Sequence, residues 1–407
     1  MPAGPRRVRD ELFGHGRGRV LAFCWLGWVF DFYDLILFAF LKVAIARDLG
    51  LEVTGPIAWI DGWTLFATAV GGFWFGRIAD ATGRRRALVL SILVYSAGAF
   101  GTAFAQDYWS LLAARCLTGI GVGGEWGIGH AIVAETYPER LRGRAAGILQ
   151  AGTPFAMGLA AAVGCFAGPE IGWRACFLLS GLPALLVVFA RAALPDAKVP
   201  KPAATGSWRE LFLPPFARPS AALLALLLVH MAGFWCTYAW MPTALLKERG
   251  ASPAFVGVYQ LGVAAAQIAA DVAFGFLADR YGRRRVFAWF CGLFTAGLLV
   301  VAWRYQTLTQ DLAWFTLAMA LTGFGTGTWS CFGVLFAVNY PERLRATAAS
   351  GFYNVGRGAQ LVTQPLMGWL AASTGTYAGA LHVGAAMGAL SAVLIWLVPD
   401  RRRPDEA

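Results

Sequence analysis

Two carboxylates three residues apart are the first candidates for chemistry in this sequence. Asp31 and Asp34 lie in Trp28-Val-Phe-Asp-Phe-Tyr-Asp34, inside an otherwise apolar run of residues. On a helix this spacing puts both acids on one face. Two carboxylates this close in a low-dielectric environment cannot both ionise cheaply, so we expect one of them to bind a proton near neutral pH. The pattern predicts a proton-coupling site; a pair of acids hydrogen-bonded for packing is the alternative.

A lone basic residue in a later apolar run could bind an anion. Arg357 shares one helix face with three polar residues at spacings of 4, 3 and 4, namely Tyr353, Gln360 and Gln364. A planar guanidinium offers two parallel donors to a carboxylate, while Gln and Tyr orient the rest of a small ligand. We therefore predict a carboxylate-binding face that includes the neighbouring Asn354. An internal ion pair from Arg357 to Glu125 or Asp271 is the alternative.

One further apolar run carries both a base and an acid, Arg115 and Glu125. Their ten-residue separation corresponds to about 15 Å along a helix, so the two do not pair directly. Each needs a partner elsewhere, and Asp31 or Asp34 is the obvious candidate. Snorkelling of Arg115 to the outer headgroups is the alternative. We add both residues to the predicted proton-coupling set.

Four weaker candidates complete these sets. Gln267 and Asp271 stand four residues apart on a helix, and we assign the amide to the substrate site and the acid to proton coupling. Trp235 and Tyr238 could form a wall of the binding cavity. With 17 Trp in the chain, anchoring at the membrane interface is the commoner explanation for any one of them.

The elements that position these residues are predicted to be membrane-spanning helices. Of the 407 residues 58% are hydrophobic and only 14% are charged, a composition too apolar for a soluble protein of several domains. Between charged clusters run apolar stretches such as 20–40, 87–104, 312–338 and 377–398, each near the roughly 20 residues that cross a bilayer. We count twelve such stretches. The sequence therefore predicts an all-α membrane protein.

The net charge of +11 follows from membrane topology. If the N-terminus is cytoplasmic, 26 of the 34 Lys and Arg residues fall in cytoplasmic segments. The positive-inside rule then puts both termini in the cytoplasm and requires no nucleic-acid partner. The seven cysteines form no C-x-x-C pair, so we expect neither a metal site nor a disulfide framework, and no cofactor.

An internal duplication divides the chain into two units. Gly76-Arg-Ile-Ala-Asp-Ala-Thr-Gly-Arg-Arg-Arg86 recurs 199 residues later as Gly275-Phe-Leu-Ala-Asp-Arg-Tyr-Gly-Arg-Arg-Arg285, and Tyr-Pro-Glu-Arg-Leu-Arg occurs at 137–142 and 340–345. Six spans in each copy give parallel repeats about an axis along the membrane normal. We predict six-helix bundles at 1–194 and 220–407, joined by a cytoplasmic linker at 195–219.

At these motifs the chain resembles the major facilitator superfamily, whose cytoplasmic loop signature G-x-x-x-D-x-x-G-R-R/K occurs here in both halves. The resemblance implies that the loops form a cytoplasmic gate between the bundles, with the Gly residues permitting close helix approach. Glu135 and Arg142 match a further element of this gate; the alternative for the Arg runs is topology alone. The implied gate residues are Gly76, Asp80, Gly83, Arg84, Glu135, Arg142, Gly275, Asp279, Gly282, Arg283 and Arg345.

A narrower resemblance concerns substrate. The Asp-x-x-Asp pair, Gly121-Val-Gly-Gly-Glu-Trp126 and Gly351-Phe-Tyr-Asn-Val-Gly-Arg357 are similar to bacterial proton symporters of organic acids, of the sialate, lactate and aromatic-acid type. This implies a monomeric inner-membrane transporter that imports a small carboxylate with protons by alternating access. Neutral sugar or polyol symport and proton-coupled export of a drug or cation remain alternatives. No catalytic motif is present, so we do not expect an enzyme; a sensor without transport is a further possibility.

Overall fold

A computed structural model describes residues 12–14, 16–185 and 207–399 of the chain. Every regular element in these ranges is a helix. The first half contains α2 (Arg17–Asp48), η1 (Val53–Ile57), α3 (Ala58–Thr82), α4 (Arg84–Ala103), α5 (Tyr108–Thr136), α6 (Glu139–Gln150), α7 (Gly152–Ala161), η2 (Ala162–Ala167), α8 (Gly168–Ser180) and η3 (Leu182–Leu185). Seven stretches of the described chain are long and apolar enough to cross a membrane by themselves.

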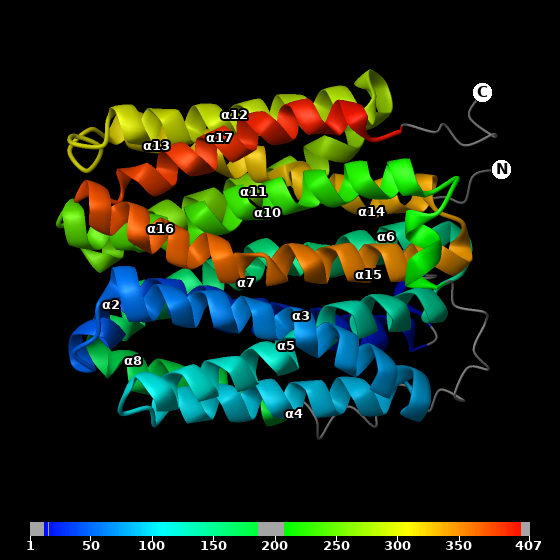
Figure 1. Cartoon of the computed structure of the whole chain (residues 1–407), viewed down its shortest axis with the longest axis horizontal. Coiled ribbons are helices and arrows are strands. Elements are labelled where there is room, and N and C mark those ends of the chain that lie inside the picture. The colour runs from blue at the N-terminus through cyan, green and yellow to red at the C-terminus, as the bar shows by residue number, and fades with distance from the viewer. Residues whose placement is uncertain (1–11, 15, 186–206, 400–407) are drawn as a thin grey trace.

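The second half repeats this order of elements. A short helix η4 (Trp208–Phe212) precedes α10 (Ala217–Thr243), η5 (Ala244–Glu248), α11 (Pro253–Tyr281), α12 (Arg283–Trp303), α13 (Leu312–Gly325), η6 (Thr326–Thr328), α14 (Trp329–Asn339), α15 (Glu342–Gly358), α16 (Gln360–Thr374), α17 (Ala378–Leu394) and η7 (Ile395–Leu397). Figure 1 shows two bundles, with α2 to α5 and α8 in the lower half of the view and α10 to α14, α16 and α17 in the upper half; α6, α7 and α15 lie nearer the middle. The predicted architecture of two six-helix membrane bundles is confirmed.

Several spans consist of more than one helix. Gly172, at φ 80° inside α8, separates the fifth span from the sixth. The tenth and eleventh spans are each broken once, at η6 and at Ala359. The predicted linker boundaries fall partly on residues 186–206, outside the described ranges, and α10 begins at Ala217. The exact division into bundles and linker therefore stays a prediction.

The duplicated loop motif adopts the same backbone turn in both copies. Gly83 has φ 98° and ψ 149° between α3 and α4, and Gly282 has φ 89° and ψ 139° between α11 and α12. A positive φ is accessible to Gly without steric cost, which explains these two glycines. The expectation of close helix approach at the first glycine of each motif is wrong, because a Cβ on Gly76 or Gly275 would meet no atom within 4 Å.

Close helix approach occurs instead at the repeated Thr-Gly-x-Gly-x-Gly motifs. A side chain at Gly119 would collide with the Thr64 carbonyl of α3, and one at Gly121 with Tyr95 of α4. In the second half, Gly323 meets α11 and Gly325 meets Phe294 of α12 in the same way. Small residues at these positions let α5 and α13 pack tightly against two neighbours each.

The main contacts between the two bundles fall into three groups. α2 contacts α10, α3 contacts α15 and α16, and α7 with η2 contacts α11. Figure 1 shows α3 and α15 facing each other across the middle of the molecule. The α3 interface extends from Gly368, where a Cβ would collide with the Thr54 carbonyl, to Phe73, whose ring lies 5.8 Å from that of Trp208. The bundles are therefore in contact at both ends of the molecule.

Candidate functional site

Asp34 and Arg115 form a buried ion pair between α2 and α5. The Arg115 Nη1 atom lies 2.5 Å from Asp34 Oδ2, and the two side chains are 1% and 0% exposed. The guanidinium also lies over the Phe38 ring at 4.8 Å. Arg115 thus finds its partner on the first helix, as expected from the sequence, and does not snorkel to the outer headgroups. Because α5 and α2 belong to one bundle, this pair does not cross the interface between the bundles.

Asp31 lies one turn earlier on the same helix and has no such partner. Both of its carboxylate oxygens are buried without a hydrogen bond, and so are those of Glu125. The Glu125 carboxylate reaches α2 at Gly27, where any side chain would collide with it. Gly27 and Asp31 are four residues apart and so share a helix face. The two acids interact electrostatically with each other, and Asp31 also with Arg357.

Arg357 faces this acidic pair from the second bundle. Its side chain is 1% exposed, and its Nε and Nη2 atoms have no hydrogen-bond partner. The guanidinium lies 4.9 Å from the centre of the Tyr353 ring and 5.8 Å from that of Trp28. Within the described ranges no carboxylate approaches Arg357 to ion-pair distance, so the internal ion pair to Glu125 or Asp271 is not formed. Its donors therefore remain available to a bound anion.

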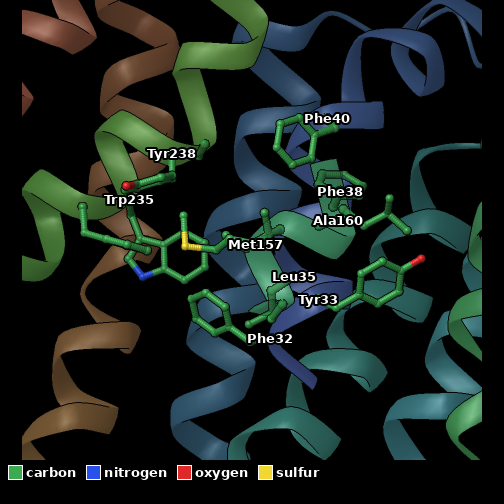
Figure 2. Packing of buried hydrophobic residues seen from close by; sticks show 14 of the residues in the cluster. Phe32, Tyr33, Leu35, Phe38, Phe40, Met157, Ala160, Trp235 and Tyr238 are labelled. Carbon is green, nitrogen blue, oxygen red and sulfur yellow. The ribbon is translucent and has the colours of Figure 1, made fainter. Parts of the chain in front are cut away.

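A small cavity lies between the bundles and is lined in part by Tyr353, the ring that the Arg357 guanidinium contacts. Its volume is about 10 Å³, enough for about one water molecule, and it is lined by Phe32, Gln150, Thr153, Met231, Phe234, Trp235, Trp329 and Tyr353. Figure 2 shows the indole of Trp235 beside Met157 and Phe32 of the first bundle. Trp126 of α5 stacks on Tyr353 of α15 with ring centres 4.4 Å apart. A substrate larger than water therefore needs the bundles to separate.

The other predicted substrate residues differ in whether their polar groups already have hydrogen-bond partners within the protein. Gln360 donates to the Gly356 carbonyl, and Gln364 accepts from the Trp240 indole. The Tyr238 hydroxyl and the Gln267 amide oxygen are buried without partners. Asn354 packs at Gly72 of α3, where a side chain would collide with it. Several polar groups of the second bundle are thus left for a ligand.

Asp271 stands apart from the acids of the first bundle. Its carboxylate accepts a hydrogen bond of 2.8 Å from the Ser330 hydroxyl, a contact between α11 and α14. No contact joins it to Arg357 or Asp31 in the described part of the chain. Its predicted role in proton coupling therefore has less geometric support than those of Asp31 and Glu125.

The predicted gate residues of the duplicated loops interact mainly inside their own bundle. Arg84 Nη1 lies 2.9 Å from Asp80 Oδ1, and its Nε atom lies 3.4 Å from Glu135 Oε1. Arg142 donates to the Tyr137 carbonyl, and Arg345 to the Ala337 carbonyl. These contacts tie the loop between α3 and α4 to the end of α5. They link no residue of the first bundle to the second.

Lys42 and Asp61 form a second buried ion pair that the sequence analysis missed. Lys42 follows the apolar run 20–40, but α2 continues to Asp48 and buries the Lys42 ammonium 3.2 Å from Asp61 Oδ2. The signal was available in Asp61, because a charge inside an apolar stretch needs a partner. Trp126 and Trp28 were likewise missed as site residues, because ring contacts between bundles depend on tertiary packing.

Comparison with known proteins gives consistent matches over the chain. Residues 23–270 and 223–407 match the sequence profile described as Major Facilitator Superfamily. A putative metabolite transport protein of Haemophilus influenzae is 34% identical over 345 residues, covering 82% of this chain and 84% of that protein. A probable 4-methylmuconolactone transporter of Cupriavidus pinatubonensis is 31% identical over 351 residues, covering 82% and 79%. The crystal structure of a D-xylose-proton symporter has the same fold, with a TM-score of 0.77 at 18% identity, covering 94% of this chain and 98% of that one.

Proposed function

The chain belongs to the major facilitator superfamily, and we propose that it imports a small carboxylic acid together with protons by alternating access. The observation that carries this proposal is Arg357, a buried guanidinium with two unpartnered donor atoms beside two unpartnered acids. A carboxylate would accept two parallel hydrogen bonds from such a group. The alternating bundles would then expose this site to one side of the membrane at a time.

The roles of the three acids follow from their partners. Asp34 is neutralised by Arg115 and remains ionised throughout the cycle. Asp31 and Glu125 lack partners and repel each other, so protonation of this pair is the coupling step. Protonation removes negative charge next to Arg357 and lets an anion occupy the guanidinium. Release of substrate and proton on the inner side restores the acidic pair for the next cycle.

The substrate class is supported by the relatives and by the lining of the cavity. Relatives in Escherichia coli are named as a sialic acid transporter and a 3-(3-hydroxy-phenyl)propionate transporter. Aromatic rings from both bundles line the cavity next to Tyr353, including Phe32 and Trp235. Such rings stack favourably on a planar ligand. We therefore favour a small organic anion with a flat or cyclic body.

A second candidate is export of a cationic compound against protons. It is favoured by the same unpartnered carboxylates, because Asp31 and Glu125 could bind a cation directly. Arg357 argues against it, since a free guanidinium near the pair repels cations. We further propose an inner-membrane location with both termini cytoplasmic, which would put the Asp80, Arg84 and Glu135 cluster at a cytoplasmic gate.

Transport in proteoliposomes distinguishes these functions. We expect labelled benzoate, or another acid from a panel of small carboxylates, to accumulate when the outside is made acidic. Arg357→Gln should abolish this uptake, whereas Arg357→Lys, which keeps the charge but loses the planar fork, should retain part of it. Accumulation that ignores the pH gradient, or that survives Arg357→Gln, would contradict the proposal. Binding of tetraphenylphosphonium that survives Arg357→Gln would favour the exporter.

A further inference from the structure

Lys42 is a fully buried lysine whose two contacts belong to different bundles. Its ammonium lies 3.2 Å from Asp61 Oδ2, on α3 of the same bundle. It also lies 4.2 Å from the centre of the Trp240 ring, on α10 of the other bundle. The Lys42 side chain is 0% exposed and that of Asp61 is 12% exposed. Asp61 neutralises the charge, and the indole face takes up the remaining side of the ammonium.

Trp240 connects this lysine to the predicted substrate face. Its Nε1 atom donates a hydrogen bond of 3.0 Å to Gln364 Oε1, and both side chains are buried. Gln364 follows Arg357 by seven residues, across the break at Ala359, and its own Nε2 atom has no partner. The indole therefore holds the Gln364 amide in one orientation, with the donor end left for a ligand.

The surrounding helices make this the outer closure of the interface. α16 packs against η1 and the start of α3 so closely that a side chain at Gly368 would collide with the Thr54 carbonyl. A Cβ on Gly62 would lie 3.2 Å from the Gln360 carbonyl oxygen. If the bundles separate at this end, Lys42 keeps Asp61 and loses Trp240. The ion pair moves with its bundle, and the cation–π contact is the part that breaks.

We propose that Lys42 is the positioning residue of the outer closure: neutralised by Asp61, its ammonium binds the face of Trp240 and so shuts the site on the outer side. The closure orients Gln364 toward the bound molecule, and this last step rests on the proposed transport function. The closure itself is independent of which compound is carried. Loss of a desolvated cation–π contact changes an equilibrium by roughly 2- to 30-fold, which is the expected size of the shift toward the outward-open state.

Hydrogen exchange of the full-length protein in lipid nanodiscs, without any ligand, tests the closure. The variants are Lys42→Met/Asp61→Asn, which removes both charges together, and Trp240→Leu. We expect exchange to rise at η1 and the outer end of α16, and to fall at η4, at the opposite end of the interface. Trp240→Phe keeps a weaker ring contact and should give an intermediate shift. Lys247→Met and Trp369→Leu alter exposed residues of the outer end and serve as controls.

Opposite changes in exchange at the two ends of the interface distinguish a role in closure from a general effect on stability. Faster exchange at both ends to the same degree would mean that Lys42 is only structural, and unchanged exchange would mean that it has no role in closure; either result overturns the proposal. The Trp240→Phe variant keeps the test decisive if the larger substitutions prevent folding. Because no substrate is added, failure here leaves the proposed carboxylate transport untouched, and failure of the uptake assay leaves the closure untouched.

Discussion

Arg115 holds Asp34 at 2.5 Å in a pair that connects two helices of one bundle and is closed to solvent. Asp34→Asn or Arg115→Gln would leave one charge buried without its partner, which costs about 3–5 kcal/mol in the free energy of unfolding. The double variant removes both charges. We therefore expect its loss in the free energy of unfolding to be smaller than the losses of the two single variants added together. A double-mutant cycle on unfolding in bicelles measures this coupling. Strictly additive losses would contradict a direct Asp34–Arg115 interaction.

The fold was predictable from the sequence because the chain contains an internal duplication. Apolar runs of membrane length and the twice-used Gly-Asp-Gly-Arg and Tyr-Pro-Glu-Arg-Leu-Arg motifs define two bundles without any tertiary information. The backbone follows the repeat closely, since Gly83 and Gly282 share one positive-φ turn. What the repeat could not show was which glycines touch a neighbour. Gly76 has open space around it, and Gly121 does not.

The sequence predicted which residues belong to the site better than it predicted which of them contact each other. Asp31, Asp34, Glu125 and Arg357 stood out because a charge inside an apolar run is costly and needs a reason. Which acid takes Arg115, and that Glu125 reaches α2 at Gly27, depends on how helices distant in sequence are rotated against each other. The pairing of Lys42 was not predicted, because hydropathy shows where the apolar run 20–40 stops and not that the helix continues past that point.

The loop glycines provide a matched test of backbone conformation. Gly83→Ala introduces a side chain at φ 98° and should destabilise the first bundle by about 1 kcal/mol or more. Gly76→Ala lies in the same motif, in helix α3 and in open space, and should be neutral or slightly stabilising. Thermal unfolding in detergent measures both. If Gly83→Ala were as stable as Gly76→Ala, the turn would not require glycine.

Glu210, which lies outside the membrane-spanning helices, should make the stability of the protein depend on pH. Arg343 donates a hydrogen bond to its carboxylate, as does the Ser207 backbone amide, and these lower the pKa of Glu210 below its ordinary value of 4.5. A carboxylate whose pKa is lower in the folded state than in the unfolded state stabilises the fold at any pH above its unfolded-state pKa. This contribution disappears as the pH falls through the lowered, folded-state pKa. We expect Glu210→Gln to reduce the melting temperature slightly at pH 6 and by less at pH 3.

The control for this titration is a residue with no such bond. Glu52 is exposed near the opposite end of the interface, and Glu52→Gln, measured alongside, is the control for removing a surface carboxylate. A melting-temperature difference between wild type and Glu210→Gln that stays the same at pH 6 and pH 3 would show that the ion pair with Arg343 does not form in solution.

Asp31 and Glu125 carry the central prediction about coupling. If this pair takes up the transported proton, Asp31→Asn or Glu125→Gln should abolish accumulation driven by a pH gradient. Exchange of labelled for unlabelled substrate needs no net proton movement, so it should persist in at least one of these variants. Asp271→Asn, which removes an acid of the second bundle bonded to Ser330, should retain gradient-driven uptake and serves as the matched control. If instead Asp271→Asn abolishes accumulation and Asp31→Asn retains it, the coupling acid lies in the second bundle, and the assignment to the Asp31–Glu125 pair is wrong.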